Sequence, residues 1–396
     1  MSDFERKHMK ILYITTFKTS DSIASSGTVN AVKRALELAG NEVTVIDDLK
    51  RPAEWELVAK IIRKITKKNF DIVREPAVLR KFDREIQKRA SQVEYDVVFS
   101  QSSILCAYYS GEKPIVFYTD ATLGGMLNYY WDEKKWVKSN LSHAKQVESL
   151  AMKNADKIIL ASQWAVNTAI EFHGADPRKC IAINRGANIV HQLKNDDIEA
   201  NVLSRTAMTQ EGQYKMLFVG RDWERKGGPV ALQIVKELNQ RGKKTKLIVV
   251  GCKPLINDDE KEYVELVGFL NKDNSDQNQK LQKLYLTSDF YLQPSRQECQ
   301  GIAYTEASAF GLPVIATNTG GVGDVVTPQN GILMEFNAET CEYTEAILNY
   351  LGDPQSYRDL SMGAFKFYQT TLNWTSVGER LTEELKKIIK EGHKSV

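Results

Sequence analysis

Two glutamates and a glycine stand close together between two apolar runs in the second half of the chain, at Glu298, Gly301 and Glu306. Between the runs 290–292 and 313–316, residues 302–310 are rich in alanine and contain no Gly or Pro, so we expect the order strand, loop, helix, strand. Gly301 falls at the start of this helix, where a missing Cβ lets the backbone approach a ligand. Unpartnered amides and the positive end of the helix dipole favour an anion there. The segment thus predicts an anion site with a carboxylate on either side.

The chemistry of these groups suits a sugar nucleotide. Amides near Gly301 and Ile302 would bind a diphosphate, because the first amides of a helix have no partner within it. An ionised carboxylate only accepts hydrogen bonds, so it matches sugar hydroxyls and repels phosphate unless it is held away from it. One glutamate would therefore bind the hydroxyls of a sugar and the other the ribose.

A second loop with suitable chemistry follows the apolar run 216–219. It reads G-R-D-W-E-R-K-G-G over residues 220–228, so glycines enclose Arg221 and Lys226. A glycine-bounded turn that carries cations at the end of a strand is what a diphosphate needs. The alternative is a solvated turn, since Arg and Lys are usually exposed.

Both loops resemble those of family 4 of the retaining glycosyltransferases. Residues 295–316 match the pattern S-R-x-E-x-x-G-x-x-x-x-E-A-x-A-x-G-x-P-V-I-A, which puts Glu298 and Glu306 at the two acids of an E-x7-E signature. Residues 220–227 resemble the G-R-x-x-x-x-K-G loop of the family. Gln300 stands where the family usually has an aromatic residue. The resemblance runs from the first predicted strand to the last predicted helix.

The resemblance implies the GT-B fold, an α/β architecture of two Rossmann-like, doubly wound domains that face each other across a cleft. It also implies a retaining, metal-independent transfer of a hexose-type sugar from a nucleoside diphosphate donor to an acceptor hydroxyl. The acceptor would be a saccharide or a lipid-linked molecule of cell-surface glycan or glycolipid synthesis.

The resemblance further implies a role for individual residues. Glu298 would fix the donor sugar and Glu306 the ribose, while Arg221 and Lys226 would hold the pyrophosphate and stabilise it as a leaving group. The remaining donor contacts expected in the second domain are Gly220, Gly268, Phe269, Gly301 and Ile302.

The β-α-β rhythm of apolar runs starts twice, which predicts two domains with parallel sheets. Residues 1–190 are expected to form the Rossmann-like acceptor domain and residues 191–374 the nucleotide-sugar-binding domain. A final helix, over 375–396, is expected to pack back on the first domain. The polar stretch 191–213 has no regular apolar pattern and is expected to be the linker.

Two candidates lie after strand-like runs of the first domain. Gly27 ends a Ser25–Ser26–Gly27 loop after the run 10–17, and Asp120 follows the run 114–119. Ligands of doubly wound sheets bind at the carboxyl ends of the strands. The loop at Gly27 is therefore a candidate second phosphate contact, and Asp120 is a candidate contact to the acceptor or the donor sugar. Helix N-capping is the alternative for both.

Composition limits the other options. The chain has 396 residues with 42% apolar content, which is enough for two domains, and its net charge of +2 does not imply nucleic acid as a partner. It has no Asp-x-Asp motif and no histidine spacing typical of metal ligands, so no metal or other cofactor is expected. Its five cysteines lack C-x-x-C spacing, and no signal peptide or membrane-length apolar run is recognisable. A reducing cytoplasm is the expected location.

The segment 50–89 is basic, with thirteen Lys and Arg against six Asp and Glu. Its apolar residues recur at helical spacing with basic residues between them: Leu57, Val58, Ile61, Ile62 and Ile65. One interpretation is peripheral contact with the anionic cytoplasmic face of a membrane. The favoured alternative is a solvated helix whose apolar stripe packs on the sheet.

Two other functions fit the same scaffold, because a fold alone does not fix function. A phosphorylase would act with inorganic phosphate, and a nucleotide-sugar epimerase would convert its substrate without an acceptor. A catalytically silent subunit would bind a nucleotide sugar without turnover, although the joint presence of Glu298, Glu306, Arg221 and Lys226 argues against it.

Overall fold

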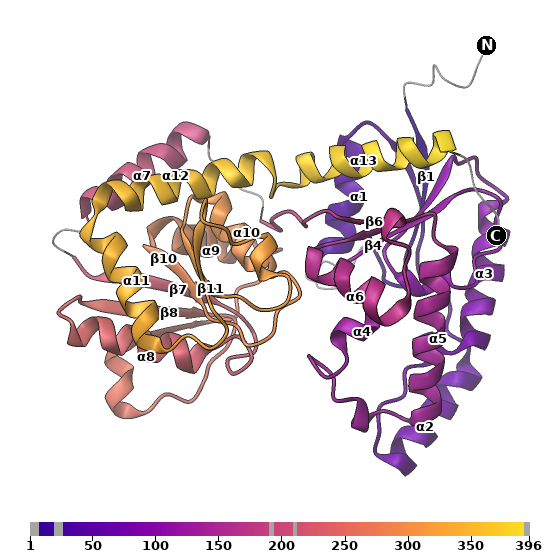
Figure 1. Cartoon of the computed structure of the whole chain (residues 1–396), viewed down its shortest axis with the longest axis horizontal. Helices are drawn as coiled ribbons and strands as arrows, with labels where there is room; N and C mark the ends of the chain where they lie inside the picture. The colour runs from indigo at the N-terminus through magenta and orange to yellow at the C-terminus, as the bar shows by residue number, and fades with distance from the viewer. Residues whose placement is uncertain (1–7, 20–26, 190–193, 209–211, 392–396) are drawn as a thin grey trace. The chain divides into compact units, whose positions relative to one another are not determined.

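The computed structural model describes residues 8–19, 27–189, 194–208 and 212–391. The chain divides into two compact units: unit 1 holds residues 1–184 and 377–396, and unit 2 holds residues 185–376. Each unit contains one sheet of six parallel strands with helices packed on it (Figure 1). This architecture confirms the predicted two-domain α/β class.

The sheet of unit 1 has the strand order β2-β1-β3-β4-β5-β6. The chain leaves β1 for β2 on one side and returns to β3 on the other, so the direction of winding reverses between β1 and β3. The strands are β1 (Lys10–Ile14), β2 (Glu42–Ile46), β3 (Val97–Ser100), β4 (Ile115–Thr119), β5 (Lys157–Leu160) and β6 (Cys180–Ala182). The helices are α1 (Thr28–Leu38), α2 (Ala53–Thr66), α3 (Pro76–Ala90), α4 (Leu123–Met126), α5 (Lys138–Asn154), α6 (Gln163–His173) and α13 (Trp374–Glu391).

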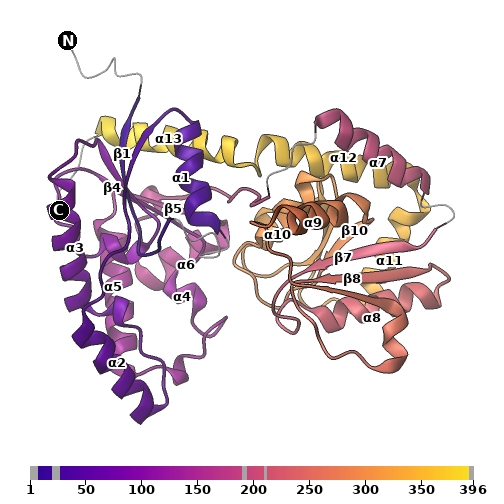
Figure 2. The same ribbon diagram turned by 180° about the vertical axis from the view of Figure 1, so that it is seen from behind.

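Helix α13 packs along α1 in unit 1, as both views show (Figure 1, Figure 2). The approach is close at Gly378, where a Cβ would lie 2.2 Å from the carbonyl oxygen of Ala35. Asn41 Nδ2 donates a 2.7 Å hydrogen bond to Thr382 Oγ1 in the same interface. Apolar side chains four residues apart, such as Leu381 and Leu385, are fully buried and give the helix its inner face.

The sheet of unit 2 has the strand order β12-β11-β10-β7-β8-β9, so its winding reverses between β7 and β10. The strands are β7 (Tyr214–Val219), β8 (Thr245–Val250), β9 (Val264–Gly268), β10 (Phe290–Gln293), β11 (Val314–Thr317) and β12 (Gly331–Met334). The helices are α7 (Asn195–Met208), α8 (Gly228–Gln240), α9 (Ser275–Thr287), α10 (Ile302–Ala309), α11 (Thr340–Gly352) and α12 (Pro354–Thr370).

The expected linker over 191–213 is largely helical, so this prediction is wrong. Residues 195–208 form α7, and Ile198 and Val202, one turn apart, are fully buried in the core of unit 2. Arg205 is also buried, and its guanidinium donates to the carbonyl oxygens of Ser288 at 3.1 Å and Gly311 at 2.7 Å. Because arginine is read as an exposed polar residue in a sequence pattern, the buried Arg205 interrupts the apolar periodicity by which α7 would have been recognised.

The favoured interpretation of α2 is also wrong, because most of its apolar stripe faces solvent. Leu57, Ile61 and Ile65 are exposed, as is Val58, whereas Ala59 is buried. The inner face packs in a small cluster around Ala59, to which Ile62 is the one residue of the stripe that contributes. Among the residues that the structure describes, no helix is both long and apolar enough to span a bilayer.

Candidate active site

The loops that carry Lys226 and Glu298 leave neighbouring strands of unit 2. Lys226 follows β7 and Glu298 follows β10, and these two strands pair in parallel at the reversal of winding. Parallel neighbours end at the same edge of a sheet, and doubly wound sheets bind their ligands where the winding reverses. The topology therefore places these two residues where doubly wound sheets bind their ligands.

Close backbone contacts join the two loops. Gly227 has a φ of 76°, and a Cβ on it would lie 1.8 Å from the carbonyl oxygen of Pro294. The amide of Arg296 donates to the carbonyl of Arg225 at 2.9 Å, and Arg225 Nη1 donates to the carbonyl of Gln297, also at 2.9 Å. Only glycine satisfies both the positive φ and the approach at 227. Sequence reasoning gave no role to Arg225, which links the loops.

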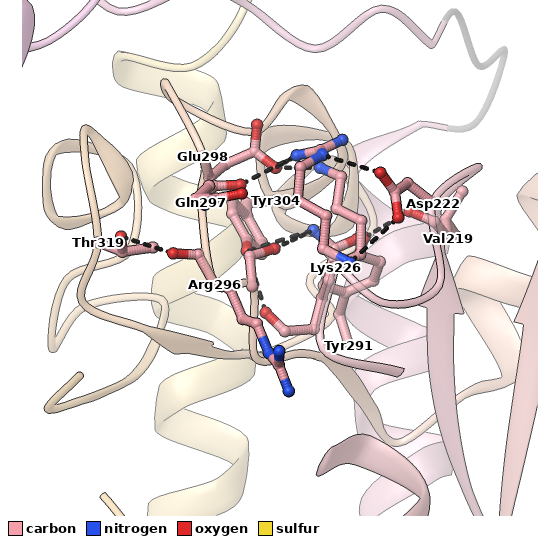
Figure 3. A network of polar contacts seen from close by, with 12 residues as sticks. Val219, Asp222, Lys226, Tyr291, Arg296, Gln297, Glu298, Tyr304 and Thr319 are labelled. Carbon is pink, nitrogen blue, oxygen red and sulfur yellow. Dashed lines mark hydrogen bonds and ion pairs between the residues drawn. The ribbon is translucent and has the colours of Figure 1, made fainter. Parts of the chain in front are cut away.

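Glu298 forms an ion pair with Lys226 across this contact (Figure 3). The two side chains are 10% and 13% exposed, so the charges are largely removed from water. Arg225 Nη1 lies 3.8 Å from the same carboxylate oxygen of Glu298, and Arg225 also pairs with Asp222 at 3.4 Å. The structure thus brings together two residues that the sequence marked separately, with a second cation beside them.

A buried hydrogen-bond network supports the loop that carries Glu298. Tyr304 Oη donates to the carbonyl of Gln293 at 3.0 Å or to Ser295 Oγ at 3.1 Å, and Tyr291 Oη donates to Gln293 Oε1 at 2.6 Å. Burial raises the pKa of the Tyr304 hydroxyl, which keeps it a neutral donor. Gly301 has a φ of 86°, and a Cβ there would lie 2.4 Å from the Tyr304 ring. Its missing Cβ therefore makes room for a ring of the protein itself.

Glu306 lies on the buried side of α10, with both oxygens engaged. Tyr285 Oη donates to Oε2 at 3.1 Å, and Lys272 pairs with Oε1. Lys272 Nζ also lies 3.4 Å from the carbonyl oxygen of Asn188. Burial, and then the charge of Glu306, raise the pKa of Tyr285. Sequence reasoning missed Lys272 and Tyr285, and neither stands in a recognisable motif.

Arg221 and Phe269 meet at a different part of the same sheet edge. The Arg221 guanidinium stacks over the Phe269 ring, 4.9 Å from its centroid, and Phe269 is 54% exposed. Gly220 follows β7, and Gly268 is the last residue of β9. Gly251 follows β8, the strand between them, and has a φ of 102°. A Cβ on Gly251 would lie 2.6 Å from the carbonyl oxygen of Gly220. These glycines let the strand ends pack closely. The roles expected for Arg221 and Glu298 remain predictions.

In unit 1, Asp120 directly follows β4, whereas Gly27 directly precedes α1, and the roles expected for both remain predictions. Gly27 is the N-cap residue of α1, with a φ of 80°. Asp120 follows β4, but Thr122 is the N-cap of α4 and its side chain accepts from the amide of Gly125 at 3.1 Å. The capping alternative for Asp120 is therefore wrong. The Ser25–Ser26 part of the loop before Gly27 lies outside the described residues.

The described residues include no group of three or more His, Cys, Asp or Glu that is arranged to hold a metal ion. The acids of the site are instead paired with lysines: Glu298 with Lys226 and Glu306 with Lys272. The expectation of a metal-free site remains a prediction.

Two family models match the chain. One, described as "Glycosyl transferases group 1", matches residues 204–367 and so includes the whole site of unit 2. The other, described as "Glycosyltransferase Family 4", matches residues 28–190. Together they cover most of both units.

Named relatives agree with this. A D-inositol 3-phosphate glycosyltransferase of Nocardia farcinica is 25% identical over 258 residues, which are 62% of this chain and 56% of that protein. An uncharacterized 41.2 kDa protein in the cps region of Klebsiella pneumoniae is 26% identical over 210 residues, which are 53% of this chain and 55% of that protein. The chain thus spans little more than half the length of these curated relatives.

Solved structures show the same fold. Sucrose-phosphate synthase from Thermosynechococcus elongatus superimposes with a TM-score of 0.66 at 18% identity, over 97% of this chain and 100% of that one. HepE of Anabaena, solved in complex with UDP, gives a TM-score of 0.63 at 17% identity, over 96% and 100%. The fold is therefore GT-B, as the sequence resemblance implied, and the chain belongs to family 4 of the glycosyltransferases.

Proposed function

We propose that the chain transfers a sugar from a nucleoside diphosphate donor to an acceptor hydroxyl with retention of the anomeric configuration. The observation that carries this proposal is the Lys226–Glu298 pair, held at the strand reversal of unit 2 beside the start of α10. It unites a cation for phosphate and a carboxylate for hydroxyls at one point. The family resemblance supports an acceptor from cell-surface glycan or glycolipid synthesis.

In the proposed reaction, the bond between the anomeric carbon and the diphosphate breaks, and a bond to the acceptor oxygen forms on the same face. The acceptor proton leaves with the diphosphate. Lys226, Arg221 and the first amides of α10 would stabilise the charge that builds up on the leaving group. Glu298 would bind hydroxyls of the donor sugar, and Glu306, which Tyr285 and Lys272 hold in place, would bind the ribose.

Nucleotide binding gives the first test. UDP, GDP, ADP, dTDP and inorganic phosphate are added to the wild type, to Lys226→Met and to Arg221→Met, and the melting temperature of each is followed. A ligand at about a hundred times its Kd adds about 2.7 kcal/mol to the free energy of unfolding. We expect one diphosphate to stabilise the wild type, with the shift lost or strongly reduced in both variants. HepE, solved with UDP, favours UDP as the first ligand to test.

Lys280→Met is the matched control, because Lys280 is an exposed lysine of α9 in the same unit. It should respond to the nucleotide as the wild type does. Arg221 is exposed as well, so its substitution tests binding without disturbing the core. A wild type that no diphosphate stabilises, or variants that respond as fully as the control, would show that the phosphate site is misplaced.

The stereochemistry and class of reaction need a second experiment. With the donor that the first test identifies and a panel of saccharide and lipid-linked acceptors, the anomeric proton coupling of the product distinguishes retention from inversion. Release of a sugar phosphate with inorganic phosphate would indicate a phosphorylase, and conversion of the donor without acceptor an epimerase. Nucleotide binding without any turnover would favour the silent subunit.

A further inference from the structure

Helix α2 turns an apolar row outward. Leu57, Ile61 and Ile65, each four residues from the next, are 61%, 49% and 76% exposed, and Val58 beside them is 41% exposed. At a rise of about 1.5 Å per residue the row is about 12 Å long. The opposite face of α2, at Ala59, is buried, so the helix is well packed on its inner side.

This row is unusual within the chain. Among the described residues, α1, α6 and α7 each have a single exposed large apolar side chain, whereas α2 has four. Single exposed apolar residues are normal on a protein surface, but a contiguous row marks a place of contact. Both views place α2 at one end of unit 1, beside α3 and α5 (Figure 1, Figure 2).

The charges around the row are mainly positive. Lys60 and Lys64 form a parallel row one position round the helix, and Lys67 and Lys68 follow its end. All four are exposed, and none of them has an ion-pair partner within the described part of the chain. The acids of the helix, Glu54 and Glu56, lie in its first turn, where they suit the helix dipole. Cations therefore border the apolar row along its second half.

We propose that this outward face of α2, formed by Leu57, Val58, Ile61 and Ile65 with Lys60 and Lys64 beside them, lies in the surface of an anionic membrane. An apolar row inserts below the headgroups while neighbouring lysines contact anionic lipid phosphates. The positive border selects this occupant, because a second copy of the same face would bring like charges together. The inference goes beyond sugar transfer and holds for any reaction of the chain.

Vesicle co-sedimentation tests the proposal on the full chain. Vesicles of phosphatidylcholine alone are compared with vesicles that contain about one-third phosphatidylglycerol, at low and at high salt. The wild type should bind the anionic vesicles at low salt and release them at high salt. Ile61→Ser/Ile65→Ser should weaken binding roughly tenfold or more, because the row loses most of its apolar contact. Lys60→Gln/Lys64→Gln should weaken it by about fivefold for each lysine.

Matched controls come from other exposed positions. Leu38→Ser removes an apolar side chain of α1 that is 66% exposed, and Lys280→Gln/Lys283→Gln removes two exposed lysines of α9. Both should bind as the wild type does, and circular dichroism should show that every variant is folded. The proposal fails if the wild type does not bind anionic vesicles, or if both α2 variants bind as well as the controls. It also fails if Ile61→Ser/Ile65→Ser instead dissociates an oligomer, since the face would then join copies of the chain.

Discussion

Removal of the Lys226 charge tests whether the pair with Glu298 is as buried as the structure indicates. In Lys226→Met the aliphatic stem is kept and the ammonium is lost. The two side chains are 13% and 10% exposed, and loss of one partner of a buried ion pair costs about 3 to 5 kcal/mol. Arg225 remains 3.8 Å from the Glu298 oxygen and offsets part of this cost. We therefore expect the free energy of unfolding to fall by about 3 kcal/mol.

A double-mutant cycle isolates the interaction. Urea unfolding is measured for the wild type, Lys226→Met, Glu298→Gln and the double variant at neutral pH, without nucleotide. The double variant leaves no uncompensated carboxylate, so it should be more stable than Lys226→Met alone and give a coupling energy of about 2 kcal/mol. Lys280→Met, at an exposed position, should change the unfolding free energy by less than about 0.5 kcal/mol.

The outcome that refutes the reasoning is equally definite. If Lys226→Met destabilises the protein no more than Lys280→Met, the pair is solvated and contributes little. If the costs of the two single substitutions simply add, Lys226 and Glu298 do not interact in solution. Either result would also remove the structural support for a preformed donor site.

Two more predictions concern backbone contact and pH. Gly227→Ala should destabilise the protein by at least about 2 kcal/mol more than Gly242→Ala. Both glycines have nearly the same φ, 76° and 77°, but only the Cβ at 227 meets a backbone oxygen. Equal costs measured by urea unfolding would show that the loops are not in contact. Burial raises the pKa of Asp289 from 3.8 to about 6. The folded state thus binds this proton more tightly than the unfolded chain, so the stabilisation is present below about pH 4 and is lost as the pH rises through 6. Relative to the wild type, Asp289→Asn should gain about 2.5 kcal/mol in unfolding free energy between pH 4 and pH 8. A difference that does not vary with pH would contradict the assigned pKa.

The sequence predicted the strands well, because a buried strand of a parallel sheet has an apolar pattern that can be read locally. Strands β1, β4 and β10 are largely continuous apolar runs because both faces of a parallel sheet are covered. Lys226 and Glu298 were identifiable because each follows such a run. Their contact was not, since it depends on the pairing of β7 with β10, which lie far apart in the sequence.

Helices were less predictable, because periodicity gives a stripe but not its direction. The row of Leu57, Ile61 and Ile65 has the spacing of a core-facing stripe, yet the small side chain of Ala59 is the one that is buried. In α7 the opposite happens, since buried Arg205 interrupts the apolar pattern of a helix that does pack on the core. Burial of a particular face is decided by neighbours that are distant in sequence.

The charges of the site explain why a segment with two acids still suits an anion. Glu298 and Glu306 would repel a diphosphate if they stood alone, but lysines from two other loops, Lys226 and Lys272, pair with them. Arg221 stacks on Phe269 instead of a carboxylate, so its charge adds to the potential at the strand ends. In the proposed function, the lysine that pairs with Glu298 would also meet phosphate. Loss of Lys226 should therefore weaken both the fold and nucleotide binding, whereas loss of Arg221 should weaken binding alone.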